Sequence, residues 1–268
     1  MKYLFCMGLI FIGLVFINVS HAKIDPSTIV ALWLFDEGKG DSINDSSGNE
    51  NHGKFMADVK WVAGKFGKAL EFDGASSIID CGKGKSIDFA GKTNFSISAW
   101  VKSDVKNTAS GMIVWKALGC ATWAQYGFGV GAIEAVAAPT NKLNFYYRKG
   151  NDGASEIVID KSDIPVNEWV HVAGTYIWKQ LSLYMNGNLV ATQDSNGVPW
   201  ASTESVYIGG DAGCGIRYVW SGAMDELIIF NVTLPKEDVA SLTRGYAGAL
   251  AVFSQDRLSI TWAEIKSE

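Results

Sequence analysis

Apolar and polar residues alternate with a period of two along most of the chain. The clearest example is FSISAWV, residues 95–101, in which alternate side chains face opposite sides of an extended strand. The same rhythm continues in residues 142–149, 156–162, 169–176 and 205–210. Asn186-Gly187 separates two strand-like runs and favours a type I′ hairpin turn. About a dozen such segments, with no helical periods between them, predict an antiparallel all-β sandwich or barrel.

One short helix is expected near the C-terminus. Thr233 is placed to cap it, Pro235 fits its first turn, and the run KEDVASLTRG ends it at Gly245. Residues 246–268 form a weakly amphipathic extension. We expect this extension to supply a strand and a final helical turn that pack on or trail from the edge of the sandwich.

Residues 1–22 have the pattern of a cleaved secretory signal. Lys2 precedes an apolar run, residues 4–17, and Ser-His-Ala at 20–22 places small residues at the −3 and −1 positions of a cleavage site. The apolar run is shorter than the roughly 20 residues that a membrane span needs. We therefore expect a mature protein that begins near Lys23, is secreted, periplasmic or held at the cell surface, and does not insert into the membrane.

Composition narrows the classes of partner. The formal net charge is −5 and no basic run is present, which argues against nucleic acid and against an anionic membrane surface. Ten tryptophans and thirteen phenylalanines, beside only five prolines, indicate a substantial packed core. The length fits one large all-β domain, which we place at residues 23–245, although length alone also permits two domains of roughly 100–150 residues.

Five motif-bearing stretches occur in a fixed order along the chain. They are VALWLFDEGKGDSINDSSGNENHGKF, GKALEFDGASSIIDCG, FSISAWVK, NEWVHVAGTYIWKQLSLYMNGNLVAT and SGAMDELIIFNVTLPKEDV. Together they resemble the landmarks of LamG-like jelly-roll domains in the concanavalin A-like lectin/glucanase superfamily, over roughly residues 29–245. The resemblance implies a two-sheet antiparallel jelly-roll β-sandwich. Because one sandwich serves lectins, glycan hydrolases, adhesion modules and spacers, this fold alone does not give the function.

The resemblance also implies a structural calcium site. In LamG-like domains two acidic loops approach the Asp of a final Asp-Glu strand, where a calcium ion commonly sits. The motifs place these ligands at Asp45, Asn51, Asp73 and Asp225 in this chain. Ca²⁺ takes six to eight oxygen ligands, and such loops are rich in them. The alternative is that Asp45 and Asn51 only form Asx turns and that Asp225 only satisfies loop amides.

Catalysis is not expected. Asp225 and Glu226 are consecutive, so on a strand they point to opposite faces and cannot jointly flank one glycosidic bond. The Glu-x-Asp-x-x-Glu pattern of catalytic members of the superfamily does not occur. After signal cleavage only His52 and His171 remain, and His171 lies in an alternating strand that favours a packing or hydrogen-bonding role. A glycoside hydrolase or lyase is the least favoured alternative.

Three loops hold the densest mixture of aromatic and cationic side chains, which suits the stacking and hydrogen-bonding needs of a sugar. The candidate ligand-binding residues are Trp123, Tyr126, Tyr147, Arg148, Arg217, Tyr218 and Trp220. Trp115, Trp169, Tyr176 and Phe230 lie within alternating strands and are expected in the core. The predicted partner is a glycan or a cell-surface or extracellular protein. The alternative is a structural or protein-interaction domain at the cell surface without a glycan site.

Three cysteines remain after signal cleavage, namely Cys81, Cys120 and Cys214. The resemblance places the loops of Cys120 and Cys214 at the ends of neighbouring strands and so implies a disulfide between them, which export permits. Cys81 follows a short strand and is expected to be a buried free thiol, consistent with the odd count.

Overall fold

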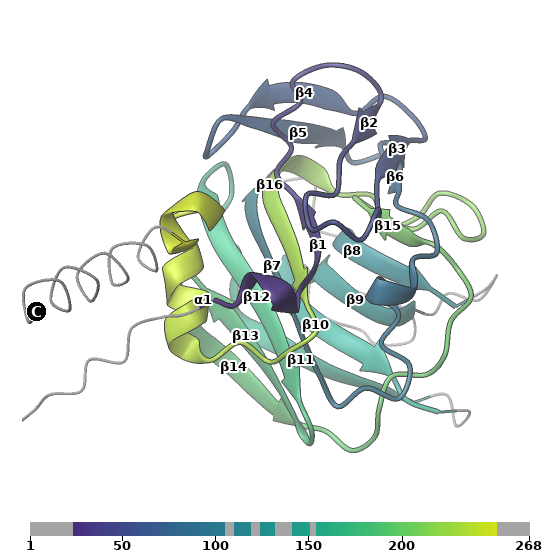
Figure 1. Cartoon of the computed structure of the whole chain (residues 1–268), viewed down its shortest axis with the longest axis vertical. Coiled ribbons are helices and arrows are strands. Elements are labelled where there is room, and N and C mark those ends of the chain that lie inside the picture. The colour runs from purple at the N-terminus through teal and green to yellow at the C-terminus, as the bar shows by residue number, and fades with distance from the viewer. Residues whose placement is uncertain (1–23, 105–109, 119–123, 132–140, 151–153, 251–268) are drawn as a thin grey trace, which may run out of the picture.

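The chain folds into two antiparallel sheets of eight strands each that pack face to face (Figure 1). The computed structural model describes residues 24–104, 110–118, 124–131, 141–150 and 154–250. The predicted all-β, two-sheet jelly-roll sandwich with a short C-terminal helix is confirmed. Residues 1–22, the predicted signal, lie outside the described part of the chain.

The first sheet carries the long central strands. Its strands, in spatial order, are β14 (Asn188–Asp194), β13 (Gln180–Met185), β12 (Trp169–Ile177), β7 (Asn94–Ser103), β16 (Ser221–Phe230), β5 (Lys68–Asp73) and β4 (Lys60–Ala63), with β1 (Ile29–Trp33) also paired to β16. The predicted hairpin joins β13 to β14, and both turn residues have positive φ, 48° at Asn186 and 76° at Gly187. This is the left-handed backbone that a type I′ turn requires.

The second sheet faces the first across the core. Its spatial order is β11 (Ser155–Asp163), β10 (Lys142–Arg148), β9 (Ala124–Gly131), β8 (Ser110–Ala117), β15 (Val206–Ile208), β6 (Ile79–Asp80), β3 (Gly53–Phe55) and β2 (Ser42–Ile43). Two short 3-10 helices, η1 (Pro26–Thr28) and η2 (Lys85–Ile87), lie in the connections.

The period-two alternation gives the main core. In β7, Phe95, Ile97, Ala99 and Val101 are fully buried between the sheets, as the sequence predicts. Full burial of one such large apolar side chain contributes about 1.5–3 kcal/mol to folding. The intervening residues of β7 therefore face the outer side of the first sheet.

A second apolar cluster covers part of that outer face. Helix α1 (Lys236–Leu242) packs through Val239 and Leu242 against Ile228 and Phe230 of β16 (Figure 1). The expected cap was wrong: Thr233 donates its hydroxyl to the Tyr176 carbonyl at 2.6 Å, and α1 has no side-chain cap. Residues 246–250 are helical, and the rest of the C-terminal extension lies outside the described residues.

Cys81 is a buried free thiol, as predicted, and burial raises its pKa well above the ordinary value. Cys120 lies outside the described residues, so the Cys120–Cys214 disulfide stays a prediction. In the part of the chain that the structure describes, no helix has the length and apolar character needed to cross a membrane.

Candidate functional site

Asp225 and Glu226 hold two different segments against β16. Asp225 is fully buried and accepts a hydrogen bond from the Phe66 N–H at 2.8 Å through Oδ2, whereas its Oδ1 has no hydrogen-bond partner among the described residues. Glu226 lies in a β-bulge with φ of 45° and accepts from the Tyr246 N–H at 2.8 Å. Burial raises the pKa of each carboxyl to about 7. The pair thus anchors the β4–β5 turn and the start of the helical segment at 246.

Asp45 and Asn51 are brought together by the loop between β2 and β3. Oδ1 of Asp45 accepts from the N–H groups of Leu32 and Ser47, and Oδ2 accepts from the backbone and side-chain amide of Asn51, all at 2.9 Å. Burial raises the pKa of Asp45, but the hydrogen bonds from these N–H groups outweigh it and hold the pKa below its ordinary value. Both carboxylate oxygens are therefore already engaged by amide donors.

Asp73 stands apart from Asp225. Its Oδ1 accepts from the N–H groups of Ala75, Ser76 and Ser77 at 2.8–3.0 Å, which holds its pKa well below the ordinary value against the raising effect of burial. Asp73 pairs with Ser221, four residues before Asp225 on β16 and so about 13 Å along the strand. In the described ranges no three His, Cys, Asp or Glu side chains form a group that could hold a metal. The calcium site stays a prediction.

Most of the predicted aromatic rim lies in the core instead of at the surface. Tyr126, Tyr147 and Trp220 are fully buried in the main cluster, and Arg148 is 1% exposed. The Tyr126 hydroxyl donates to the Ile87 carbonyl at 3.1 Å. Tyr126 and Tyr147 follow the inward phase of β9 and β10, so their side chains point between the sheets. Trp123 lies outside the described residues.

Arg217 and Tyr218 do reach the surface, on the outer side of the second sheet. Arg217 forms an ion pair with Asp211 at 2.5 Å, and its guanidinium lies 5.8 Å from the Tyr218 ring centre. The Tyr218 ring lies 5.3 Å from Trp115, which is buried in an outer-face apolar cluster with Tyr146 and not in the main core. Tyr218 is therefore the partly exposed member of a packed aromatic group.

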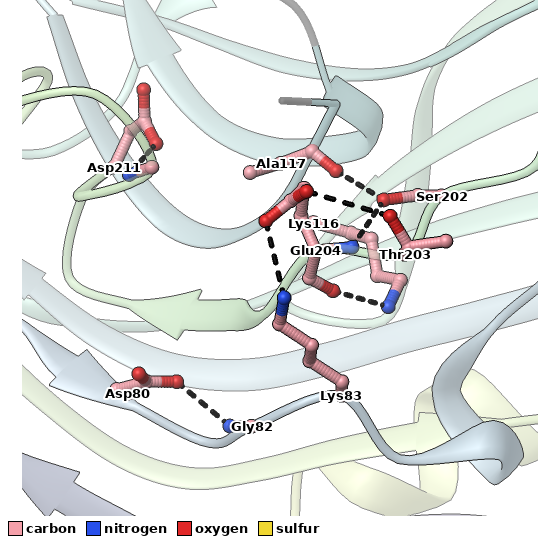
Figure 2. Close-up of polar contacts among 10 residues, drawn as sticks. Asp80, Gly82, Lys83, Lys116, Ala117, Ser202, Thr203, Glu204 and Asp211 are labelled. Carbon is pink, nitrogen blue, oxygen red and sulfur yellow. Dashed lines mark hydrogen bonds and ion pairs between the residues drawn. The ribbon is translucent and has the colours of Figure 1, made fainter. Parts of the chain in front are cut away.

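The polar side chains near this cluster are engaged with one another. Figure 2 shows Lys116 donating to the Glu204 carbonyl at 2.8 Å, while Lys83 pairs with the Glu204 carboxylate at 3.4 Å. Ser202 donates to the Ala117 carbonyl at 2.5 Å. Burial lowers the pKa of Lys116. Because these groups close the loops beside β8 and β15, we interpret them as structural.

A groove crosses the outer face of the first sheet at the opposite end from α1. Two adjoining cavities of about 270 and 350 Å³ share Glu71, Asp104 and Gly222 as lining residues. We call this surface the acidic groove. Its charged, amide and aromatic lining residues are Asp58, Lys60, Glu71, Phe72, Asp73, Lys102, Asp104, Asn167 and Trp169.

The strand register lines up the groove residues in one row. Lys60 pairs with Glu71, Glu71 with Ala223, Ala223 with Lys102, and Lys102 with Trp169. The row crosses β4, β5, β16, β7 and β12, and directly paired residues share a face of the sheet. Four strand spacings make it about 19 Å long. Small Ala223 at its centre leaves space between the flanking charged side chains.

Two close contacts shape the groove. Gly222 has φ of 128°, and a Cβ there would lie 2.1 Å from the Lys102 carbonyl oxygen, so only glycine lets β16 approach β7 in this way. At one end the β4–β5 turn closes the face, where the Phe66 ring lies 5.8 Å from Trp100 and Lys65 lies 4.6 Å over the same ring.

His171 lies on the same face of the sheet, in the row of paired residues next to the groove. It pairs with Trp100, and its Nε2 lies 2.8 Å from the Ser98 hydroxyl. Burial lowers its pKa to about 3, so the imidazole is neutral near pH 7. The predicted hydrogen-bonding role of His171 is confirmed.

Sequence reasoning missed the groove residues. It placed Trp169 in the core, but the side chain is half-buried and lines the groove, because it occupies the outward phase of β12. The alternation of KALEFDG and FSISAWVK marks Glu71 and Lys102 as outward-facing. What the alternation does not show is that β5, β16, β7 and β12 are neighbours.

The fold is shared with solved binding domains. The binding domain of Paraclostridial Mosquitocidal Protein 1 is 17% identical with a TM-score of 0.64, over 82% of this chain and 53% of that one. Domain 4 of AbnA, an extracellular arabinanase from Geobacillus stearothermophilus solved with arabinotriose, is 19% identical with a TM-score of 0.61, over 81% of this chain and 98% of that domain.

A botulinum neurotoxin type C structure concerned with ganglioside interaction is 16% identical with a TM-score of 0.62, over 82% of this chain and 51% of that one. This chain therefore spans about half of the toxin binding domains and almost all of the arabinanase domain. At these identities the likeness establishes the fold alone.

Sequence comparison gives a family. No curated protein matches the sequence. A family model described as the concanavalin A-like lectin/glucanases superfamily matches residues 74–240, which is more than half of the chain. The chain therefore belongs to the concanavalin A-like lectin/glucanase superfamily.

Proposed function

We propose that this chain is a secreted or surface-held, non-catalytic carbohydrate-binding domain, and that its glycan lies in the acidic groove. The observation that carries the proposal is the row from Lys60 to Trp169, with small Ala223 at its centre. A ligand laid along this row meets an aromatic face at one end and charged hydrogen-bonding groups along its length.

The chemistry of the groove favours a neutral, hydroxyl-rich ligand. Carboxylates accept hydrogen bonds from sugar hydroxyls, and charge-assisted hydrogen bonds are stronger than neutral ones. The indole of Trp169 offers an apolar face for the C–H side of a sugar ring. Four carboxylates, on Asp58, Glu71, Asp73 and Asp104, outnumber the two ammonium groups in the lining. This excess of negative charge disfavours a polyanionic glycan.

Structural neighbours support the proposal. The arabinanase domain was solved with arabinotriose, and this chain matches almost its whole length. The toxin structure concerns ganglioside molecules, which also carry sugars. Arabino-oligosaccharides are accordingly the first probes to use, followed by an array of neutral glycans.

Variants of the groove test the proposal. Trp169→Ala and Glu71→Gln each remove one part of the row, and we expect each to weaken glycan binding roughly 10- to 100-fold in calorimetric titration. Trp178→Ala is the matched control, because Trp178 is 48% exposed and lies outside the groove. Equal binding by all four proteins would contradict the placement. No binding to any glycan would favour the protein-interaction alternative.

Calcium remains a separate part of the proposal. The feature in its favour is Oδ1 of Asp225, a fully buried carboxylate oxygen without a hydrogen-bond partner among the described residues. We expect millimolar CaCl₂ to raise the melting temperature by several degrees over EDTA, since a ligand at 100 times its dissociation constant adds about 2.7 kcal/mol. Asp225→Ala should abolish the shift. An unchanged melting curve, with no ion found by metal analysis, would remove calcium from the account.

A further inference from the structure

A second cavity lies at the other end of β7 and β16. Its volume is about 500 Å³, and its lining includes Lys85, Asp88, Phe89, Lys92, Asn94 and Asn231. Asn94 begins β7 and Asn231 follows the end of β16, whereas Lys102 and Gly222 of the acidic groove lie at the opposite ends of the same strands. Nine residues of extended strand separate the two regions by about 30 Å. We call this cavity the basic pocket.

Hydrogen bonds from the β2–β3 loop hold the wall of the basic pocket in place. Ser86, the central residue of η2, lines the pocket, and its hydroxyl oxygen accepts from the side-chain amide of Asn51 at 3.1 Å. Asn51 is in turn held by Asp45 at 2.9 Å. The loop that carries two of the predicted calcium ligands therefore also supports the pocket wall.

Four polar side chains of the pocket are exposed at its surface and available to a ligand. Within the described residues, Lys85 and Lys92 make no ion pair, and the side-chain amides of Asn94 and Asn231 make no hydrogen bond. Asp88 differs, because its Oδ1 accepts from the Ala90 N–H at 3.1 Å and from the Gln125 amide at 2.5 Å. Two ammonium groups face one carboxylate that is already engaged, so the pocket has a net positive charge.

We propose that the basic pocket binds an anionic group, a carboxylate or a sulfate ester, carried on a sugar. Ammonium groups form short, charge-assisted hydrogen bonds with such oxygens, and the two amides add neutral donors. Phe89 and Val30 lie beneath the pocket, 2% and 6% exposed, and the cavity of about 500 Å³ has room for a sugar ring beside its anionic group. The site goes beyond the proposed function, because it lies elsewhere and selects the opposite charge.

The test compares four probes on the whole protein. A tri-galacturonate, a sulfated trisaccharide, the matching neutral trisaccharide and sodium sulfate alone are titrated by calorimetry in low salt. We expect one or both anionic sugars to bind at least 10-fold more tightly than the neutral one. The carboxylated and sulfated arms identify which anion the pocket prefers. Equal binding of neutral and anionic sugars, or no binding of either anionic sugar, would overturn the proposal.

A charge-matched pair of variants locates the site. Lys85→Gln with Lys92→Gln should weaken anionic sugar binding at least 10-fold. Lys39→Gln with Lys54→Gln makes the same change of net charge at exposed lysines outside the pocket and should leave binding within twofold. Asn231→Asp places a like charge in the pocket and should also weaken binding. An equal loss in the control pair would show a general charge effect and overturn the site.

The outcome is separable from that of the proposed function. Trp169→Ala removes an element of the acidic groove about 30 Å away and should leave anionic sugar binding unchanged. The Lys85→Gln, Lys92→Gln variant should conversely retain neutral glycan binding. A loss of both activities in either variant would contradict two independent sites.

Discussion

The acidic groove and the basic pocket lie at opposite ends of the same two strands and are built in different ways. The groove is a product of regular register, since its central row is five paired residues on adjacent strands. The basic pocket takes its lysines from η2 and the segment after it, and its asparagines from strand ends. The comparison shows that the two ends of one pair of strands can carry surfaces of opposite charge.

The largest effect is expected from the backbone of the groove. Gly222→Ala introduces a Cβ 2.1 Å from the Lys102 carbonyl oxygen at φ of 128°, so β16 must move away from β7. We expect a loss of about 3 kcal/mol in the free energy of unfolding, measured by urea denaturation. Gly150→Ala is the control, because Gly150 has φ of 47° but no atom within 4 Å of a built Cβ. It should cost roughly 1 kcal/mol. Equal costs would show that the close approach is unimportant.

The centre of the groove row gives the next effect. Ala223→Tyr places a large side chain between Glu71 and Lys102, where strand geometry tolerates an aromatic residue. Neutral glycan binding should fall roughly 30-fold or more, equivalent to about 2 kcal/mol. Anionic sugar binding at the basic pocket should not change. Retained glycan binding by a folded Ala223→Tyr protein would contradict the proposal that the groove is the glycan site.

A pH dependence of stability follows from the carboxyl pair beside the groove. Burial raises the pKa of Asp225 from 3.8 and that of Glu226 from 4.5, each to about 7. Between about pH 4 and pH 7 the folded protein retains protons that the unfolded chain has released, so stability falls as pH rises through this window and levels off above it.

Asp225→Asn removes one of these two titrations. The variant should lose less stability than the wild type between pH 5 and pH 8, by roughly 1–2 kcal/mol in urea denaturation. Asp194→Asn, at an exposed carboxyl that ends β14, is the control and should follow the wild type. Identical pH dependence in the Asp225→Asn protein and the wild type would contradict the assigned shift.

The smallest expected effect is that of salt concentration on the two binding affinities. Raising the salt concentration from 20 to about 150 mM shortens the screening length to about 8 Å. Anionic sugar binding at the basic pocket should weaken several-fold, whereas neutral glycan binding at the groove should stay within twofold. Parallel titrations at the two salt concentrations measure both. The same salt dependence for both ligands would remove the electrostatic difference between the regions.

Local patterns predicted the fold better than they predicted the site. Alternation in residues 95–101 and the Asn186-Gly187 turn depend only on near neighbours in the chain, so both could be read directly. The groove row joins residues from Lys60 to Ala223, and its existence depends on which strands are adjacent. Tyr126 and Tyr147 were misplaced for a related reason, because a position beside a loop does not decide which phase of the strand points inward.

The polar loops, too, could be predicted only in part from local sequence patterns. The Asx turn at Asp45, with the Ser47 N–H on Oδ1 at 2.9 Å, was one of the two alternatives left by the sequence. The basic pocket was not foreseen at all. Lys85, Lys92, Asn94 and Asn231 have no shared motif, and they meet only because η2, the start of β7 and the end of β16 lie together.

The most direct test of the account is a titration of the isotope-labelled protein with arabinotriose, followed through the backbone amide signals in NMR spectra. We predict that the largest shifts fall at Glu71, Lys102, Trp169 and Ala223, along one row of the first sheet. Signals of the basic pocket should not move. Shifts centred instead on Arg217 and Tyr218, or on the basic pocket, would contradict the acidic groove as the glycan site.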